Sequence, residues 1–141
     1  MNKNYALITG STAGIGLDIA QELASRGHNI LLTARREDLL KDIAQQLMTD
    51  HGVHADYVVA DLGDVSAPGV IFNFCASNEY VVNILVNNAG YSINKKFHET
   101  GEEEEEKFLR VLGLGVIALT KRFIPGMLQQ KSGKIMLVSS L

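Results

Sequence analysis

The chain has 141 residues, of which 46% are hydrophobic and 21% are charged, so it can bury one substantial core, and we expect a single domain over residues 1–141. Thirteen basic residues against sixteen acidic ones give a net charge of −3, which provides no field to attract nucleic acid or an anionic membrane. Only four apolar residues follow the polar start, too few for a signal sequence, and no later apolar run approaches the length of a membrane span. The lone cysteine, Cys75, cannot form an internal disulfide, so we expect a buried thiol in a soluble, cytoplasmic protein.

Short apolar runs of strand length alternate with longer stretches that have the period of a helix. This alternation predicts repeated strand–helix–strand units, and therefore an α/β fold with a mostly parallel sheet. The runs are almost continuously apolar, which is typical of strands that helices cover on both faces. The five predicted strands span residues 5–9, 30–34, 57–60, 84–86 and 135–138.

Apolar side chains at helical spacing predict the segments between the first three strands. Ile15, Ile19 and Leu23 recur every fourth residue and predict a first helix that ends at Gly27. The same spacing over residues 39–47 predicts a second helix.

Two further helices are predicted later in the chain. Residues 64–80 predict a helix that Asp64 or Ser66 caps, with a proline tolerated in its first turn. Residues 102 to about 130 are helical in period and broadly apolar, and we expect Pro125 to bend or end this helix. Five consecutive glutamates open it, and we interpret them as a solvated helix start, because carboxylates favour the positive end of the helix dipole. Neither these glutamates nor the four histidines have the spacing of metal ligands, so we predict no metal site.

A glycine-rich turn separates the first predicted strand from the first predicted helix. Gly10 allows a tight turn, Gly14 allows a pyrophosphate to approach the backbone, and Gly16 permits close helix–strand packing. Glycines at this spacing are a weak signal alone, but their position between a strand and a helix favours a phosphate-binding turn. The residues of the turn that we expect to contact a dinucleotide are Gly10, Ser11, Thr12, Gly14, Ile15 and Gly16.

Two more motifs follow the third and fourth predicted strands. Asp61-Leu62 alone could cap the next segment, and Asn88 with Gly90 alone could form an ordinary turn. Together with the spacing Thr-Gly-x-x-x-Gly-x-Gly, however, these residues resemble the short-chain dehydrogenase/reductase family, which has an Asn-Asn-Ala-Gly motif and an adenine-contacting Asp. The three motifs also fall at the carboxyl ends of three strands, where open α/β sheets bind ligands. The resemblance covers effectively the whole chain.

The resemblance implies a three-layer, doubly wound parallel sheet of the Rossmann type with strand order 3-2-1-4-5, with the C-terminal strands missing. It also implies a nicotinamide cofactor and hydride transfer to or from a small-molecule carbonyl or alcohol. Beyond the glycine-rich turn, the expected cofactor contacts are Asp61, Leu62, Asn88, Ala89 and Gly90.

The end of the second predicted strand indicates which nicotinamide cofactor is used. A carboxylate at this position binds the ribose diol and repels a 2′-phosphate, but here the position holds Ala34 and the next residue is Arg35. An arginine meets a phosphate with paired N–H donors, so Arg35 favours NADP(H) over NAD(H). We interpret Arg36 as an exposed loop charge.

The resemblance implies a catalytic Ser, Tyr and Lys with an Asn that completes a proton relay. Ser140 follows the fifth predicted strand at the Ser position, and we expect the chain to be truncated before the Tyr-x-x-x-Lys segment. Tyr91 and Lys95 have the same spacing but precede the Ser, so they form a polar loop rather than this pair. The Asn position holds Leu112, and a leucine cannot hold the relay water.

Three functions remain in competition. The leading prediction is the cofactor-binding part of an NADP(H)-dependent oxidoreductase, and the alternative is a catalytically dead dinucleotide-binding module of the same fold. A methyltransferase that uses S-adenosylmethionine shares the sheet, but it would prefer a carboxylate where Ala34 stands. Because apolar residues lie on more than one face of the predicted helix over residues 102–130, we also expect this helix to pair with its copy in a homo-oligomer.

Overall fold

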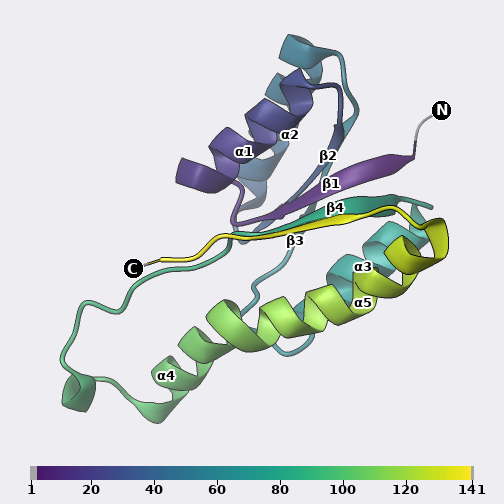
Figure 1. The fold of residues 1–141 in the computed structure, drawn as a ribbon. Coiled ribbons are helices and arrows are strands. Elements are labelled where there is room, and N and C mark those ends of the chain that lie inside the picture. Colours follow the sequence, from purple (N-terminus) through teal and green to yellow (C-terminus); the bar gives the residue numbers. More distant parts are fainter. Residues whose placement is uncertain (1–2, 141) are drawn as a thin grey trace.

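The computed structural model describes residues 3–140, which form a five-stranded sheet between two layers of helices (Figure 1). All strand pairs are parallel and the order is β3-β2-β1-β4-β5, which confirms the predicted fold class. The strands are β1 (Asn4–Thr9), β2 (Asn29–Ala34), β3 (Ala55–Val59), β4 (Val81–Asn87) and β5 (Lys134–Leu137).

Helices cover the two faces of the sheet in pairs (Figure 1). Helices α1 (Gly14–Ser25) and α2 (Glu37–His51) lie on one face, and α3 (Ala67–Ser77) and α5 (Gly115–Gln130) lie on the other. Successive strand residues point to opposite faces, so β1 sends Ile8 into the core under α1 and α2, and Leu7 into the core under α3 and α5. The central strands are therefore buried on both faces, as their apolar runs predict.

Helix α3 is shorter than predicted and has a different start. Ser66 is its N-cap residue, but in the described chain no side chain caps the helix. The prediction that a side chain of Asp64 or Ser66 caps α3 was therefore wrong. Instead, the Asp64 carbonyl accepts the Ala67 N–H at 3.2 Å, which is a turn-like bond that leads into the helix.

The long helical segment contains a turn that the sequence analysis did not predict. Helix α4 (Glu102–Leu109) passes into a π-helical turn, η2 (Arg110–Leu114), and then into α5. The Gly115 N–H bonds to the Arg110 carbonyl across this turn, and a Cβ on Gly115 would lie only 2.9 Å from that oxygen. A glycine at this position therefore permits the wider turn, which is a feature often found at functional sites.

Pro125 does not end the helix, since α5 continues past it to Gln130. A proline removes one backbone hydrogen bond. Phe123 and Met127 are buried against the sheet on either side of it, and this packing holds the helix together across the missing bond.

The stretch Glu102–Gln130 is also long and apolar enough to cross a membrane, judged by length and composition alone. The expectation that no apolar run approaches this length was therefore wrong for this stretch. In this fold, however, Val111, Leu119 and Phe123 belong to the core beneath the sheet, as in a helix that covers a sheet.

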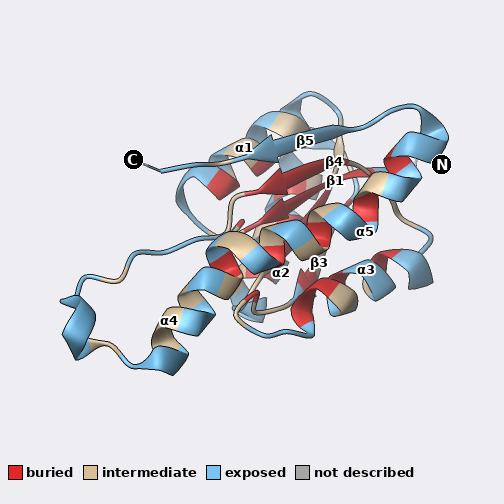
Figure 2. Cartoon of the chain, turned by 60° about the horizontal axis from the view of Figure 1, so that its bottom comes forward, coloured by how far each residue is buried: buried red, intermediate tan, exposed pale blue. Residues whose placement is uncertain are grey.

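Strand β5 is the exception to the expectation that helices cover both faces of every strand. All of its residues are exposed, whereas β4 beside it and β1 beyond β4 are largely buried (Figure 2). An apolar groove of about 720 Å³ separates it from α1. The apolar side chains that line the groove are Ile15, Ile19, Leu23, Ile84, Val86, Ile135 and Met136.

Candidate functional site

The carboxyl ends of all five strands meet at one edge of the sheet because the strands are parallel. Gly10 follows β1, Arg35 follows β2, Asp61 lies two residues beyond β3, Asn88 follows β4, and Ser140 lies three residues beyond β5. The topology therefore brings the predicted cofactor residues to one edge, where open α/β sheets bind ligands.

The glycine-rich turn has the backbone that the motif requires. Gly10 and Gly14 have φ angles of +62° and +56°, a left-handed region that favours glycine. A Cβ on Gly16 would lie 2.3 Å from the Gly10 carbonyl oxygen and 2.4 Å from Asn88 Nδ2, so only glycine fits there. Among the described residues, apart from the chain neighbours of Gly14 and the backbone of α1, no heavy atom lies within 4 Å of where a Cβ on Gly14 would stand. The backbone at Gly14 is therefore open to an approaching group.

The first turn of α1 is arranged to receive an anion. Its N-cap residue, Ala13, has an extended backbone, and within residues 3–140 no side chain caps the helix and no acidic residue lies in its first turn. The positive end of the helix dipole is thus not neutralised by the protein itself. Open backbone at Gly14 and uncapped N–H donors fit the pyrophosphate of a dinucleotide.

The other predicted residues of this turn differ in exposure. Ile15 is 59% exposed, and Thr12 is half-buried. Ser11 is fully buried, and its hydroxyl donates to the Thr33 carbonyl oxygen at 3.4 Å. The Ser11 side chain therefore ties the turn to β2 and faces the protein interior.

Asn88 ties the glycine-rich turn to the end of β4. Its Nδ2 donates to the carbonyl oxygens of Thr9 and Gly10, each at 3.1 Å. The Thr9 Oγ1 accepts the backbone N–H groups of Asn88 and Ala89, each at 2.9 Å. Asn88 and Ala89 were predicted from the sequence as site residues, but the role of Thr9 was not. The signal was present, because Thr9 is the first residue of the recognised Thr-Gly motif.

A pocket of about 340 Å³ lies between the ends of β2 and β3. Its polar wall comes from Arg35, Asp61, Asp64 and Ser66, and its apolar wall includes Val70. Leu62 is buried beneath the loop beside this pocket. Arg36 instead pairs with Asp38 at 2.6 Å on the exposed surface, as expected of a loop charge.

The carboxylate of Asp61 is held by two donors. Its Oδ1 accepts the Gly63 N–H at 2.8 Å, and its Oδ2 pairs with Lys107 Nζ at 3.1 Å. Burial alone would raise the pKa of the Asp61 carboxyl, but the Gly63 N–H, Lys107 and the Arg35 charge together hold this pKa below its ordinary value. Asp61 therefore stays an anionic hydrogen-bond acceptor. Lys107 was not predicted, because it comes from a distant helix.

The opposite end of the edge carries Leu112, Gly90 and Ser140. Leu112 lies in η2 and is 43% exposed, and its Cδ2 lies 2.9 Å from where a Cβ on Gly90 would stand. A hydrocarbon side chain therefore covers the end of the Asn88–Gly90 turn. Ser140 is exposed beyond β5.

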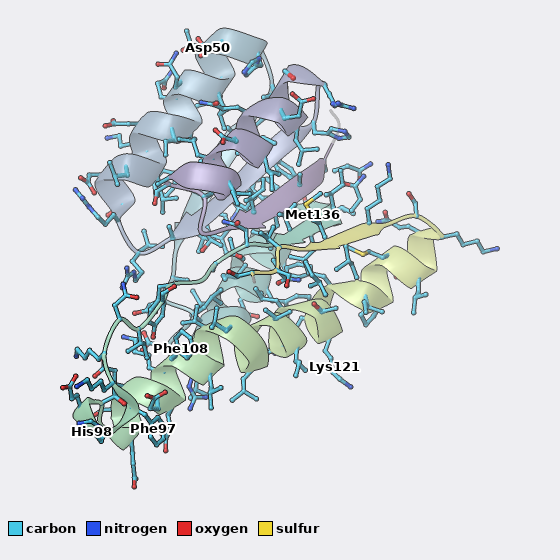
Figure 3. All side chains as sticks on the ribbon, turned by 60° about the vertical axis from the view of Figure 1, so that its left-hand side comes forward. Asp50, Phe97, His98, Phe108, Lys121 and Met136 are labelled. Atoms are coloured by element: carbon cyan, nitrogen blue, oxygen red, sulfur yellow. The ribbon has the colours of Figure 1, made fainter. Side chains whose placement is uncertain are left out.

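The loop from Tyr91 to Lys95 contains no helix. The Tyr91 ring packs edge-on against Phe108 with centroids 5.3 Å apart, and Lys95 pairs with Glu104 at 3.1 Å. Figure 3 places Phe97 and His98 beyond this loop, in the short 3-10 helix η1 (Phe97–Glu99), and Phe108 on α4. Tyr91 and Lys95 thus do not share one helix face, in agreement with their interpretation as a loop.

Comparisons with known proteins agree with this fold. The sequence profile of the family described as short chain dehydrogenase matches residues 4–141. The chain belongs to this family of oxidoreductases.

Individual relatives cover nearly the whole chain. It is 33% identical to L-xylo-3-hexulose reductase from Hypocrea jecorina over 96% of this chain and 51% of that protein. It is 33% identical to the human inactive hydroxysteroid dehydrogenase-like protein 1 over 96% of this chain and 42% of that protein. The structure superposes on L-sorbose reductase from Gluconobacter frateurii, solved with NADPH and L-sorbose, with a TM-score of 0.92, 31% identity, and coverage of 100% of this chain and 54% of that one. The chain thus spans about half the length of the relatives it matches.

Proposed function

We propose that the chain binds NADP(H) and forms the cofactor-binding part of an oxidoreductase that acts on a carbonyl or alcohol substrate. The open, left-handed backbone at Gly14, next to the uncapped start of α1, carries this proposal, because it leaves N–H donors free to face a pyrophosphate. The L-sorbose reductase of similar fold was solved with NADPH.

Each part of the cofactor has a candidate partner along the edge. The turn over residues 10–16 would hold the pyrophosphate, Asp61 and Leu62 the adenine, and Asn88 to Gly90 the nicotinamide side. When bound, the nicotinamide supplies hydride transfer. Ser140 would orient the substrate oxygen, as its place after β5 in this family implies.

Arg35 is the proposed partner of the 2′-phosphate, and Arg36 offers a matched control. Both arginines are exposed, but only Arg35 lines the pocket beside Asp61. Titration with NADPH and NADH should show tighter NADPH binding, with the preference lost in Arg35→Glu. Arg35→Gln should weaken NADPH binding by about tenfold, which is the size of a charge-assisted hydrogen bond, whereas Arg36→Gln should leave NADPH binding unchanged. NADH binding as tightly as NADPH to the unaltered chain would refute the NADP(H) proposal.

A catalytically inactive dinucleotide-binding module is the second candidate. Leu112 favours it, because this hydrocarbon side chain occupies the relay position beside Gly90. One relative of similar identity also carries the description inactive. NADPH oxidation by the purified chain against a panel of carbonyl compounds would exclude the inactive module. A reading frame that continues past codon 141 and encodes Tyr-x-x-x-Lys would support the enzyme.

We also propose that the chain self-associates through the stretch Glu102–Gln130. Leu114, Ile117 and Leu128 are more than half exposed on α5 and its preceding turn, which is an apolar surface that a second copy can bury. Sedimentation should show a dimer or larger oligomer that Ile117→Glu dissociates. A monomer at high concentration would count against this surface. The cytoplasmic location expected from the sequence stays a prediction.

A further inference from the structure

Lys107 reaches from α4 across to the loop that follows β3. Its Nζ lies 3.1 Å from Asp61 Oδ2, and the side chains of Lys107 and Asp61 are 46% and 26% exposed. A Cβ on Gly63 would stand 2.3 Å from the Lys107 Cε and 2.7 Å from its Cγ, so the aliphatic stem lies directly against the Gly63 backbone. Lys107 is thus anchored both along its stem and at its charged end.

The geometry leaves the Asp61 carboxylate oriented but not saturated. Gly63 donates to one carboxylate oxygen and Lys107 to the other, while an ionised carboxylate offers about four acceptor positions. Two donors on different segments prevent the group from rotating freely. The remaining acceptor positions are available to a ligand in the pocket that Arg35, Ser66 and Val70 also line.

We propose that Lys107 is a positioning residue for the adenosine end of the dinucleotide: it holds the Asp61 carboxylate, through Nζ and the stem packed on Gly63, in the orientation that accepts the adenine amino group. This inference rests on the proposed function and extends it to a residue of α4. Neither the glycine-rich turn nor the motifs after β3 and β4 contain this residue.

The charged groups around the pair set its pH dependence. Within the described chain, two cations face Asp61: Lys107, which lies on α4, and Arg35, which follows β2. Lys107 also interacts with Asp64 and Tyr91. The hydrogen bond to Asp61 raises the pKa of Lys107, so the ammonium group stays charged at neutral pH. Removing that charge should let the pKa of Asp61 rise toward its ordinary value, so that binding is lost at a higher pH on acidification.

The test compares Lys107→Met, which keeps an unbranched side chain but loses the charge, with Lys107→Arg, which keeps the charge. Lys121→Met is the matched control, because Lys121 is exposed on α5 and points away from the sheet (Figure 3). Binding of 2′,5′-ADP to the full chain is measured between about pH 2.5 and 8, so that the range includes the lowered pKa of Asp61 and its ordinary value of about 3.9. The Asp61 carboxyl is titrated by carbon NMR without ligand, and circular dichroism confirms that each variant is folded.

We expect Lys107→Met to weaken 2′,5′-ADP binding by about threefold at pH 7, the size of a partly exposed ion pair. In this variant, the pH at which acid abolishes 2′,5′-ADP binding (the acid limb) and the pKa of Asp61 should both be higher. Lys107→Arg should restore both, and Lys121→Met should alter neither.

Failure of the inference and failure of the proposed function give different results. Equal affinity and equal pH profiles for the unaltered chain and Lys107→Met would overturn the role of Lys107 and leave dinucleotide binding intact. Weakened binding without a shift of the Asp61 titration or of the acid limb would also overturn it, since a purely structural effect gives that result. No binding of 2′,5′-ADP or NADPH by any form would overturn the proposed function and this inference together.

Discussion

Thr9 and Asn88 hold each other through reciprocal hydrogen bonds: the Thr9 Oγ1 accepts the Asn88 N–H at 2.9 Å, and Asn88 Nδ2 donates to the Thr9 carbonyl oxygen at 3.1 Å. Thr9 ends β1 and Asn88 follows the neighbouring strand β4, so these bonds couple the glycine-rich turn to the turn after β4. The proposed pyrophosphate and nicotinamide ends of the site are therefore one hydrogen-bonded unit.

Replacing Thr9 with valine should destabilise the fold measurably. The change removes the Thr9 Oγ1, which accepts the N–H groups of both Asn88 and Ala89. We expect the loss of these hydrogen bonds to lower the free energy of unfolding by about 1–3 kcal/mol. Urea denaturation measures this difference. Thr49→Val is the control, because the Thr49 hydroxyl bonds the Gln45 carbonyl on an exposed helix face, and its cost should stay within about 0.5 kcal/mol. Equal losses in both variants would contradict the coupling.

Two glycine-to-alanine changes should have opposite effects on the stability of the fold. A methyl group at Gly16 would collide with the Gly10 carbonyl oxygen and Asn88 Nδ2, so Gly16→Ala should destabilise the fold and distort the turn. Gly126 lies in α5, and among the described residues no heavy atom outside its chain neighbours and the α5 backbone lies within 4 Å of where a Cβ would stand. Gly126→Ala should therefore stabilise the fold by about 0.5–1 kcal/mol. Thermal unfolding distinguishes the two, and a stabilising Gly16→Ala would refute the packing at the turn.

The thiol of Cys75 should be unreactive in the folded chain. Burial raises the pKa of Cys75 to about 12, so almost no thiolate exists at pH 8. Labelling with a disulfide reagent should proceed at the rate of unfolding in buffer and become fast in strong denaturant. Rapid stoichiometric labelling of the folded chain would show that α3 opens without global unfolding.

Acid should weaken the contribution of Asp61 to stability. The pKa of Asp61 is lowered in the fold, so its stabilising effect is complete above the unfolded pKa of about 3.9 and is lost as the pH falls through the lower folded value. Asp61→Asn should therefore be less stable than the unaltered chain at pH 7, with the difference in unfolding free energy narrowing as the pH falls below about 3.9. In a Lys107→Met background, Asp61→Asn should lower the free energy of unfolding by less, because the ion pair is already absent. A gap that stays constant with pH would contradict the lowered pKa.

Much of the fold could be predicted because local pattern and topology agree. Apolar runs separated by amphipathic helices specify a parallel sheet with two helical layers, and the strands confirm this. The exposure of β5 could not be predicted from the sequence. An apolar run indicates that a strand can be buried, but it does not show whether a helix lies beside the strand to cover it. Likewise, the continuity of α5 through Pro125 depends on the burial of Phe123 and Met127 against the sheet.

The sequence by itself determined the family, the fold and the set of loops that form the candidate site, because glycine positions and strand ends are local properties of the chain. Only the tertiary structure decided what the side chains in those loops do. In the fold, Asn88 donates to the carbonyl oxygens of Thr9 and Gly10, Lys107 pairs with Asp61, and Leu112 packs against Gly90. These contacts join residues that are distant in sequence, and their geometry depends on the packing of helices against the sheet, which no local pattern encodes.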